Sequence, residues 1–399
     1  MQRTNALLLA LLLVLPSGAQ QVPCSPPPKG VDPAMPLNQS DRFAWQLFVE
    51  VNQKAAARYQ QTITSGGKTF TTNSAVWETW ADDPLTFPED PYPANPPKWP
   101  DAPFLKSLRQ KAKGTHAPRA VHVLDTGSEE VHRNRATFDY VLANSLWYQQ
   151  GIAAFVKSGT AANFPADSIE VKANWIPITE SQKSQYHWNY DEKGNLYGLV
   201  ATHITSKAIP NWFWATFEWV GNAGRCDFIG CSDCFGTTPA FVPSNTTTVG
   251  QVYPSGSITP ALQAMFAKAG YSGEWLAQYQ NYRLKGSQTD FTLPTGKPIL
   301  LGNSVTESSF LQTASCMTCH ARAAVTTAGA NAFPFFGEAQ PLPLQNSIPA
   351  QYQTQDTTYN GTPDPNWYTT YTSNGPVKLY TQMDFVWAIP FQAQPAKTK

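Results

Sequence analysis

Apolar residues recur every three or four positions in several segments of the chain, and this spacing predicts helices. The first helix is expected from Arg42 to about Arg58, behind a polar cap, and the second from Asn134 to Lys157. Two shorter helices are predicted at Ala261–Ala269 and Glu274–Tyr279. Because each has an apolar side, each is expected to pack against another layer of the protein.

The middle of the chain alternates instead between apolar and polar positions, which is typical of half-buried strands. Strands are predicted at Ile169–Trp175, Tyr197–Ser206 and Trp212–Val220. A hairpin over Tyr282–Leu301 and a last strand at Asp384–Ile389 follow later in the chain. We therefore predict an α+β fold, with an antiparallel sheet as its core, flanking helices and long proline-rich loops.

The first residues of the chain predict export. Arg3 precedes the apolar run Ala6–Pro16, and the small residues Ser17–Ala19 resemble a cleavage site. Residues 1–19 are therefore expected to form a secretory signal peptide. The apolar run is too short to span a membrane, so no integral membrane segment is expected in the mature chain. We expect the mature protein in the periplasm or outside the cell, where unclaimed thiols are oxidised.

Two proline-rich stretches divide the mature chain. Residues 20–38 predict an extended N-terminal arm, and residues 83–103 predict a long surface loop. Residues 39–399 are expected to form a single large domain. The formal net charge of the whole chain is zero at pH 7. This balance argues against nucleic acid or an anionic membrane surface as a partner.

The most specific chemical signal is the run Cys316-Met317-Thr318-Cys319-His320, which matches the C-x-x-C-H pattern of covalent haem attachment. In a helix these three side chains share one face, so two thioether bonds to the porphyrin and a proximal histidine for its iron are possible together. A capping pattern at Ser309 and a closing Gly329 predict such a helix within the segment 305–330. A local disulfide or half of a zinc site would use the same residues.

The other four cysteines are Cys24, Cys226, Cys231 and Cys234. In an oxidising compartment we expect them to form two disulfides, one joining Cys24 to the later cluster and one within that cluster. The spacing C-x4-C-x2-C of the cluster also occurs among the ligands of plant-type iron–sulfur ferredoxins. That interpretation needs Cys24 as a distant fourth ligand, and the disulfides explain the same residues more simply.

The sequence leaves the sixth ligand of the iron open. His203 lies in a predicted strand, and Met383 follows the motif at an interval like that of small cytochromes c. For both residues a core position is the favoured interpretation, and an open or water-filled position on the iron is the other possibility. His187 lies near a predicted turn and is expected at the surface, and Glu218 is expected to be a satisfied buried acid. The histidines without a surrounding pattern are His116, His122 and His132.

Several spaced blocks carry a further signal across most of the mature chain. They are 43–48 (FAWQLF), 76–80 (VWETW), 170–175 (EVKANW), 198–204 (GLVATHI), 212–218 (WFWATFE) and 301–304 (LGNS), ahead of 315–320 (SCMTCH). In these blocks the chain resembles a family of exported bacterial proteins called cytochrome c family proteins. The resemblance implies one covalently bound haem c, held by Cys316 and Cys319 with His320 on the iron, and it implies no settled activity.

Two classes of function follow from a single haem. The first is electron transfer in the periplasm, with a redox partner protein. The alternative is a haem-dependent oxidoreductase or a small-molecule sensor, in which an open distal position, with His203 beside it, meets a small oxidant such as peroxide. The part of the chain after His320 predicts no closing helix, so the haem is expected on a larger β-containing domain and not in a small cytochrome module.

Overall fold

A computed structural model describes residues 24, 35–100, 128–245, 250–308, 310–332, 361–363 and 368–397. The predicted signal peptide, most of the proline-rich arm, Ser309, His116 and His122 lie outside these residues. The described part combines helices with antiparallel strands, in agreement with the predicted α+β class.

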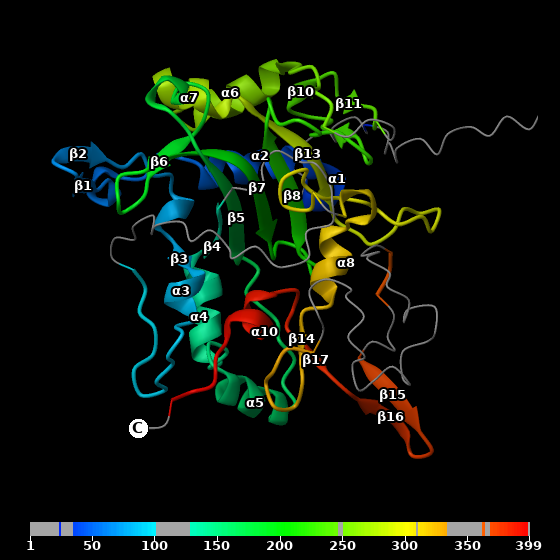
Figure 1. Ribbon diagram of the computed structural model, residues 1–399. Helices are drawn as coiled ribbons and strands as arrows, with labels where there is room; N and C mark the ends of the chain where they lie inside the picture. The colour runs from blue at the N-terminus through cyan, green and yellow to red at the C-terminus, as the bar shows by residue number, and fades with distance from the viewer. Residues whose placement is uncertain are drawn as a thin grey trace, which may run out of the picture.

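A seven-stranded antiparallel sheet occupies the centre of the molecule (Figure 1). Six strands follow one another across it, and the seventh also pairs with β7. In spatial order the six are β13 (Tyr282–Gln288), β8 (Phe213–Trp219), β7 (Leu196–Ser206), β5 (Ile169–Pro177), β4 (Ser128–Arg133) and β3 (Ala81–Asp82), and the seventh is β6 (Trp188–Tyr190). The strands predicted in the middle of the chain are therefore confirmed as β5, β7 and β8.

Short elements surround this sheet. The helices are α1 (Met35–Asn38), α2 (Ser40–Val51), α3 (Asp83–Thr86), α4 (Arg135–Ala143), α5 (Gln149–Lys157), α6 (Pro260–Lys268), α7 (Gly273–Tyr279), α8 (Cys316–Ala321) and α10 (Ala388–Gln392). The two-stranded pairs are β1 (Thr62–Ser65) with β2 (Lys68–Thr71), β9 (Cys231–Ser232) with β11 (Phe241–Val242), β10 (Thr237–Thr238) with β12 (Ser257–Ile258), β14 (Ala324–Val325) with β17 (Thr381–Gln382), and β15 (Thr369–Thr372) with β16 (Gly375–Lys378).

One face of the central sheet is apolar and is covered by α2. Alternate residues of β8, among them Phe213 and Phe217, point to this face because side chains alternate along a strand. Trp45 and Phe48 of α2 pack on Phe217, with ring centroids 5.0 and 4.4 Å away. Helices α6 and α7 extend the same core at the top of Figure 1. This cluster is the main hydrophobic core of the described chain.

The opposite face of the same strands is polar. The residues between the core positions of β8 are Trp214, Thr216 and Glu218, and the register places His203 of β7 beside Thr216. Lys172 of β5 lies beside His203 in turn. Glu218, Thr216 and His203 are all buried, so this face is polar and yet closed to solvent.

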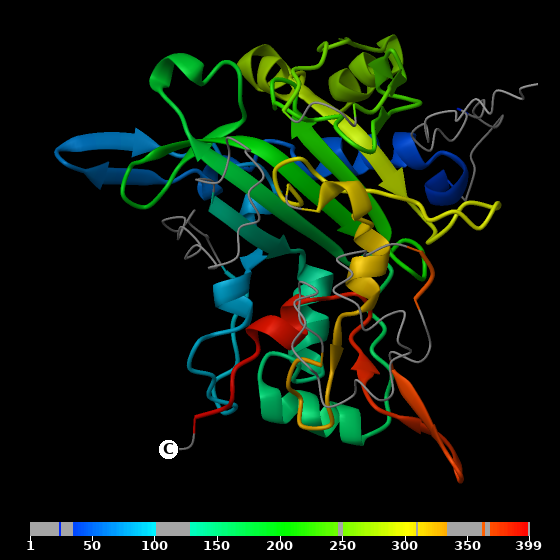
Figure 2. The same cartoon turned by 45° about the vertical axis from the view of Figure 1, so that its right-hand side comes forward.

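A second apolar cluster lies below the sheet, where α4, α5, α10 and the end of α8 meet (Figures 1 and 2). The cluster contains Phe155 of α5 and Trp147, which lies just before that helix, together with Met317 and Met383. Helix α8 lies beside the lower ends of the central strands in both views. It therefore stands between the second cluster and the polar face of the sheet.

The cysteine pairing agrees with the expected pattern. Cys24 is joined to Cys234, and Cys226 is joined to Cys231. The first bond ties the N-terminal arm to the middle of the chain across a separation of 210 residues. Since all four sulfurs are in disulfides, the iron–sulfur interpretation of this cluster is wrong.

Two of the predicted helices differ from those observed. Helix α2 ends at Val51 instead of Arg58, because Asn52 donates its side-chain amide to Phe48 O and the chain then turns to pair with a distant segment. The predicted helix Asn134–Lys157 is two helices, α4 and α5. Ser145 between them has a positive φ of 56° and breaks the helix.

Three later predictions also need correction. Within the predicted hairpin Tyr282–Leu301, β13 pairs with β8, and only a short hairpin remains, in which Thr292 pairs with Pro298. The helix that carries the C-x-x-C-H motif is only Cys316–Ala321, since the chain beyond it forms β14 and Gly329 lies in a turn. The predicted strand Asp384–Ile389 is wrong, because positive φ angles at its first two residues turn the chain into α10.

Candidate functional site

The side chain of Gln288, at the end of β13, fixes the start of α8. Its Nε2 donates to Ser315 Oγ over 2.8 Å, and its Oε1 accepts from Met317 N over 3.1 Å. These bonds hold the first turn of a helix too short to persist alone. The turn therefore presents Cys316, Cys319 and His320 from a position that is anchored to the central sheet.

Cys316 and Cys319 are free thiols, whereas the other four cysteines of the chain are all in disulfides. They stand one helical turn apart, and Cys319 is buried. Burial raises the pKa of Cys316 well above its usual range and that of Cys319 to about 11. The local-disulfide interpretation is not what the structure shows. The surroundings favour a neutral sulfur, as in a thiol or a thioether, over a thiolate ligand.

His320 is held in one orientation by two contacts. Its Nδ1 lies 2.8 Å from the carbonyl oxygen of Phe385, and its ring centroid is 4.4 Å from that of Trp214. Because a carbonyl oxygen only accepts, Nδ1 must carry the hydrogen. Burial lowers the pKa of His320 to about 4, so the ring is neutral at pH 7. Its Nε2 is therefore the nitrogen that keeps a lone pair for a ligand bond.

A row of charged side chains on the polar face of the sheet lies close to this histidine. His203 Nε2 is 3.3 Å from Glu307 Oε1, without the geometry of a hydrogen bond, and Lys172 Nζ is 3.0 Å from Glu129 Oε2. The charges of Lys172 and His203 depress the pKa of His320, and that of Glu307 raises it. The structure thus brings His203 into the surroundings of the motif, as the sequence analysis considered.

Met383 and His187 occupy core positions. Met383 is fully buried in the second apolar cluster, and its N–H donates to Ala323 O over 2.7 Å. It lies two residues before Phe385, on the segment that binds Nδ1 of His320. His187 is also fully buried, with its Nε2 2.7 Å from Glu78 Oε2, so its expected surface position is wrong. Aromatic rings that are distant in sequence enclose it.

Several residues that surround α8 could not be predicted from the sequence. Glu307, Gln288, Lys172 and Trp214 meet around α8 only because the strand register brings four separate segments together. The alternation of Lys172 with apolar residues was the one available signal, since it indicates a polar side of that strand. Glu218 was expected as a satisfied buried acid and is one, with Lys285 Nζ 3.5 Å away and Asn222 as a donor.

Within the described ranges, no group of three or more His, Cys, Asp or Glu side chains is arranged to hold a metal ion. A second set of zinc ligands beside Cys316 and Cys319 is therefore not found there. In the same part of the chain no helix is both long and apolar enough to cross a membrane.

Comparisons with known proteins return no match among family models, curated proteins or solved structures. The resemblance to cytochrome c family proteins thus remains a prediction made from the residues.

Proposed function

We propose that this protein carries one haem c, bound through Cys316 and Cys319 with His320 as the proximal iron ligand, and that it transfers electrons. The observation that supports the proposal most strongly is the contrast among the cysteines. Four form disulfides, and the two of the C-x-x-C-H motif remain as thiols on one turn of α8. Free thiols in an exported, disulfide-bonded protein need a chemical reason, and thioether formation supplies one.

The surroundings of the motif fit such a group. The hydrogen bond from His320 Nδ1 to Phe385 O is the kind of support that orients a ligand histidine and makes its other nitrogen a better donor. Haem, when bound, supplies reversible one-electron chemistry at its iron. The contribution of the chain is to hold the imidazole through Phe385 and Trp214, and to anchor α8 through Gln288.

A second function, reaction with a small oxidant at an open iron position, is favoured by the contact of His203 with Glu307. To bind iron through Nε2, His203 would have to leave Glu307, which lies 3.3 Å from that nitrogen. As placed, the pair is better suited to accept and donate a proton near the motif than to act as a sixth ligand. Met383, packed in the apolar cluster, also fits a core role.

The attachment is tested with the double variant Cys316→Ser/Cys319→Ser, expressed with its export signal in a bacterium that matures c-type cytochromes. We expect the denatured variant to contain no haem, because no thioether can form. The matched control Cys226→Ser/Cys231→Ser also removes two sulfurs and should keep its haem. Haem staining of denatured protein in a gel reads both out. Haem retained by the first variant, or absent from the control and the wild type alike, contradicts the proposal.

The sixth position is tested by adding carbon monoxide to the reduced wild-type protein and recording the absorption spectrum. Rapid carbon monoxide binding supports the open position and the second function. A slow or absent reaction supports a six-coordinate electron carrier. His203→Ala then separates the two roles of that residue: an unchanged oxidised spectrum excludes it as a ligand, and a changed one supports ligation.

The expected location of the protein also belongs to this proposal. Two disulfides agree with an oxidising compartment, and we propose the periplasm as the place where haem attachment and these bonds form together. Recovery of the mature protein in a periplasmic extract, with its chain starting near residue 20, tests it.

A further inference from the structure

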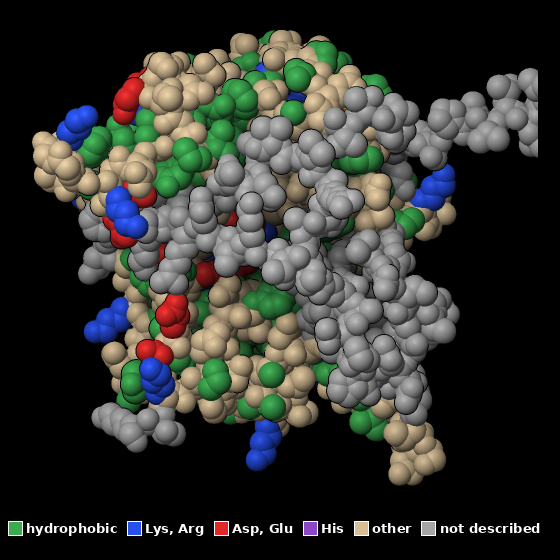
Figure 3. All heavy atoms as spheres, viewed as in Figure 1, with side chains coloured by type: hydrophobic (Ala, Val, Ile, Leu, Met, Phe, Trp, Pro, Cys, Tyr) green, Lys and Arg blue, Asp and Glu red, His purple; other side chains and the backbone are tan. Residues whose placement is uncertain are grey.

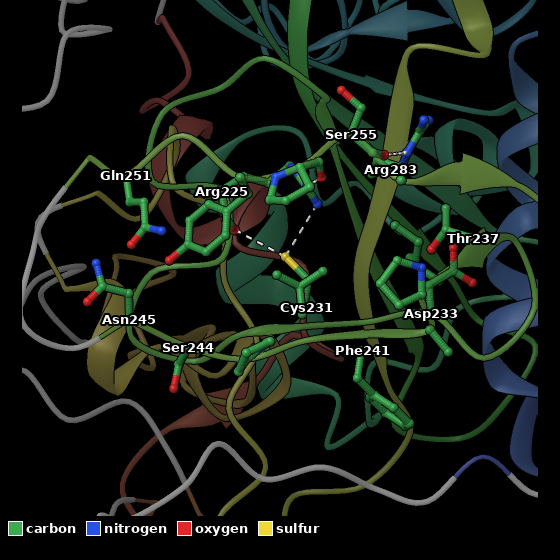
Figure 4. A pocket seen from close by; sticks show the side chains of 18 residues that line it. Arg225, Cys231, Asp233, Thr237, Phe241, Ser244, Asn245, Gln251, Ser255 and Arg283 are labelled. Carbon is green, nitrogen blue, oxygen red and sulfur yellow. Dashed lines mark hydrogen bonds between the residues drawn. The ribbon is translucent and has the colours of Figure 1, made fainter.

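A cavity of about 590 Å³ lies beside the central sheet (Figure 4), and no residue of the C-x-x-C-H motif lines it. Its walls come from the strand β13, from the turn that follows β8, and from the short strands β9, β10 and β11. The disulfide Cys226–Cys231 braces one wall, and Cys24–Cys234 holds an adjoining segment. The volume falls in the range of small-molecule sites, roughly 300–1,000 Å³.

Two arginines line this cavity and are almost completely buried. Arg225 is 3% exposed and Arg283 is 7% exposed. Their oxygen partners are main-chain carbonyls: Arg225 donates to Pro254 O over 3.2 Å, and Arg283 donates from Nε to Ser255 O over 2.7 Å. The Nε of Arg225 is buried without a hydrogen-bond partner. Because a carbonyl oxygen carries no formal charge, these hydrogen bonds do not neutralise the two guanidinium groups.

No carboxylate of the described residues forms an ion pair with either arginine. Asp233 also lines the cavity, but its oxygens accept from Trp45 Nε1 and from the amide of Gly236. Burial and the nearby charge of Arg225 lower the pKa of Arg283 to about 10, against the attraction of Asp233, so Arg283 is still charged at pH 7. Burial also lowers the pKa of Arg225. Glu218 and Asp233 attract these charges from a distance, but neither forms an ion pair with them. A buried charge without a direct ion-pair partner is unfavourable, and a bound anion would relieve it.

We propose that this cavity binds a small organic carboxylate. A guanidinium group matches a carboxylate in shape and charge, and its donors are too many for the carbonyls around it. Phe241, Tyr253 and Pro239 line the same space and would contact an apolar body, whereas Gln251 offers a polar group to a second end. This site does not depend on the proposed haem.

The proposal is tested by calorimetric titration of the purified full-length protein, carrying whatever cofactor it contains, at pH 7. The probes are benzoate, citrate, inorganic phosphate and benzamide, the last being a neutral analogue of benzoate. We expect benzoate, citrate or both to bind saturably. If benzoate binds, benzamide should bind at least tenfold more weakly. Phosphate should bind more weakly than the better carboxylate.

The residues are tested with Arg225→Gln and Arg283→Gln, each expected to weaken carboxylate binding tenfold or more. The control Arg58→Gln removes an exposed arginine outside the cavity and should leave binding unchanged. Circular dichroism checks that each variant is folded. If a variant is not folded, the proposal is tested on the wild-type protein alone, by comparing its affinity for benzoate and citrate with its affinity for benzamide and phosphate. Absence of carboxylate binding, equal binding of benzamide, preference for phosphate, or unchanged binding in both folded variants overturns the proposal.

Discussion

The two faces of the central sheet are built from the same strands and have opposite character. On one face Phe213, Phe217 and their neighbours pack against α2 in an apolar core. On the other, the residues between them place Thr216, Glu218 and His203 in a buried polar layer. Burial of apolar side chains stabilises a fold, whereas burial of charged ones opposes it unless each is paired. The apolar face therefore accounts for much of the stability of the fold, and the polar face is the one that adjoins the proposed haem-binding helix.

The position of α8 strengthens this contrast. The helix with the two free thiols adjoins the polar face and the second apolar cluster, and it makes hydrogen bonds with the end of β13. On the described part of the face drawn in Figure 3, charged side chains are few and are scattered among apolar and uncharged atoms. Several charged contacts are instead partly or fully buried, around Lys172, Glu307 and Glu218. Such an arrangement is typical of sites whose electrostatics are tuned for chemistry.

The largest effect is expected on the apolar face. Phe217→Ala removes a fully buried ring that touches both Trp45 and Phe48. We expect it to lower the free energy of unfolding by about 3–5 kcal/mol, measured by urea denaturation. Val252→Ala, at a residue 73% exposed, is the control and should change it by less than about 0.5 kcal/mol. Similar losses in the two variants would contradict the assignment of this face as the core.

The next effect breaks a pair on the polar face. Glu218→Gln removes the nearest counter-charge of the buried Lys285, 3.5 Å away, and leaves only the more distant Glu307. We expect a loss of about 3 kcal/mol in the free energy of unfolding, because an unpaired buried charge is unfavourable. The double variant Glu218→Gln/Lys285→Met removes both charges and should be more stable than Glu218→Gln alone. If the second change makes the protein still less stable, the two groups do not act as a buried ion pair.

The last expected effect depends on pH and concerns His132, which lies beside Trp77 at the edge of the main hydrophobic core. Burial opposes the charge of His132, but Glu130, 3.1 Å from its Nε2, and Asp82 outweigh it and raise its pKa to about 9. Since the folded pKa lies above the ordinary value of 6.5, this stabilisation is complete below pH 6.5 and is lost as the pH rises through 9. The loss between pH 6 and 9.5 should be about 3 kcal/mol in the free energy of unfolding.

This pH dependence is measured by urea denaturation of the wild-type protein and of His132→Gln between pH 6 and 9.5. The difference between the two proteins should shrink as the pH rises. A constant difference across this range would mean that the charge of His132 does not contribute.

The local patterns that predicted the fold were strongest where one face of an element is apolar. The alternation in Ile169–Trp175 and Trp212–Val220 predicts two strands of the sheet correctly, because one side of each meets the core. Boundaries failed where distant contacts decide them. Asn52 ends α2 through a side-chain bond to Phe48 O and a second bond from Trp77, which comes from another segment.

The candidate site was predicted in part for the same reason. Cys316, Cys319 and His320 are neighbours in sequence, so their spacing alone indicates shared chemistry. Glu307 and Lys172 join them only through strand register and through the path of the chain after β13, which no local pattern encodes. His187 shows the opposite failure: its sequence neighbours indicate a turn, and its burial comes from rings elsewhere in the chain.

The central claim, that the polar face of the sheet supports a haem c, is tested most directly on the wild-type protein by its pyridine haemochromogen spectrum after acid–acetone extraction. We predict one haem per chain, retained by the polypeptide through the extraction, with the spectrum of a haem whose two vinyl groups are saturated by Cys316 and Cys319. Haem that extracts into the solvent, or protein matured in a c-type cytochrome host that contains none, would contradict the account.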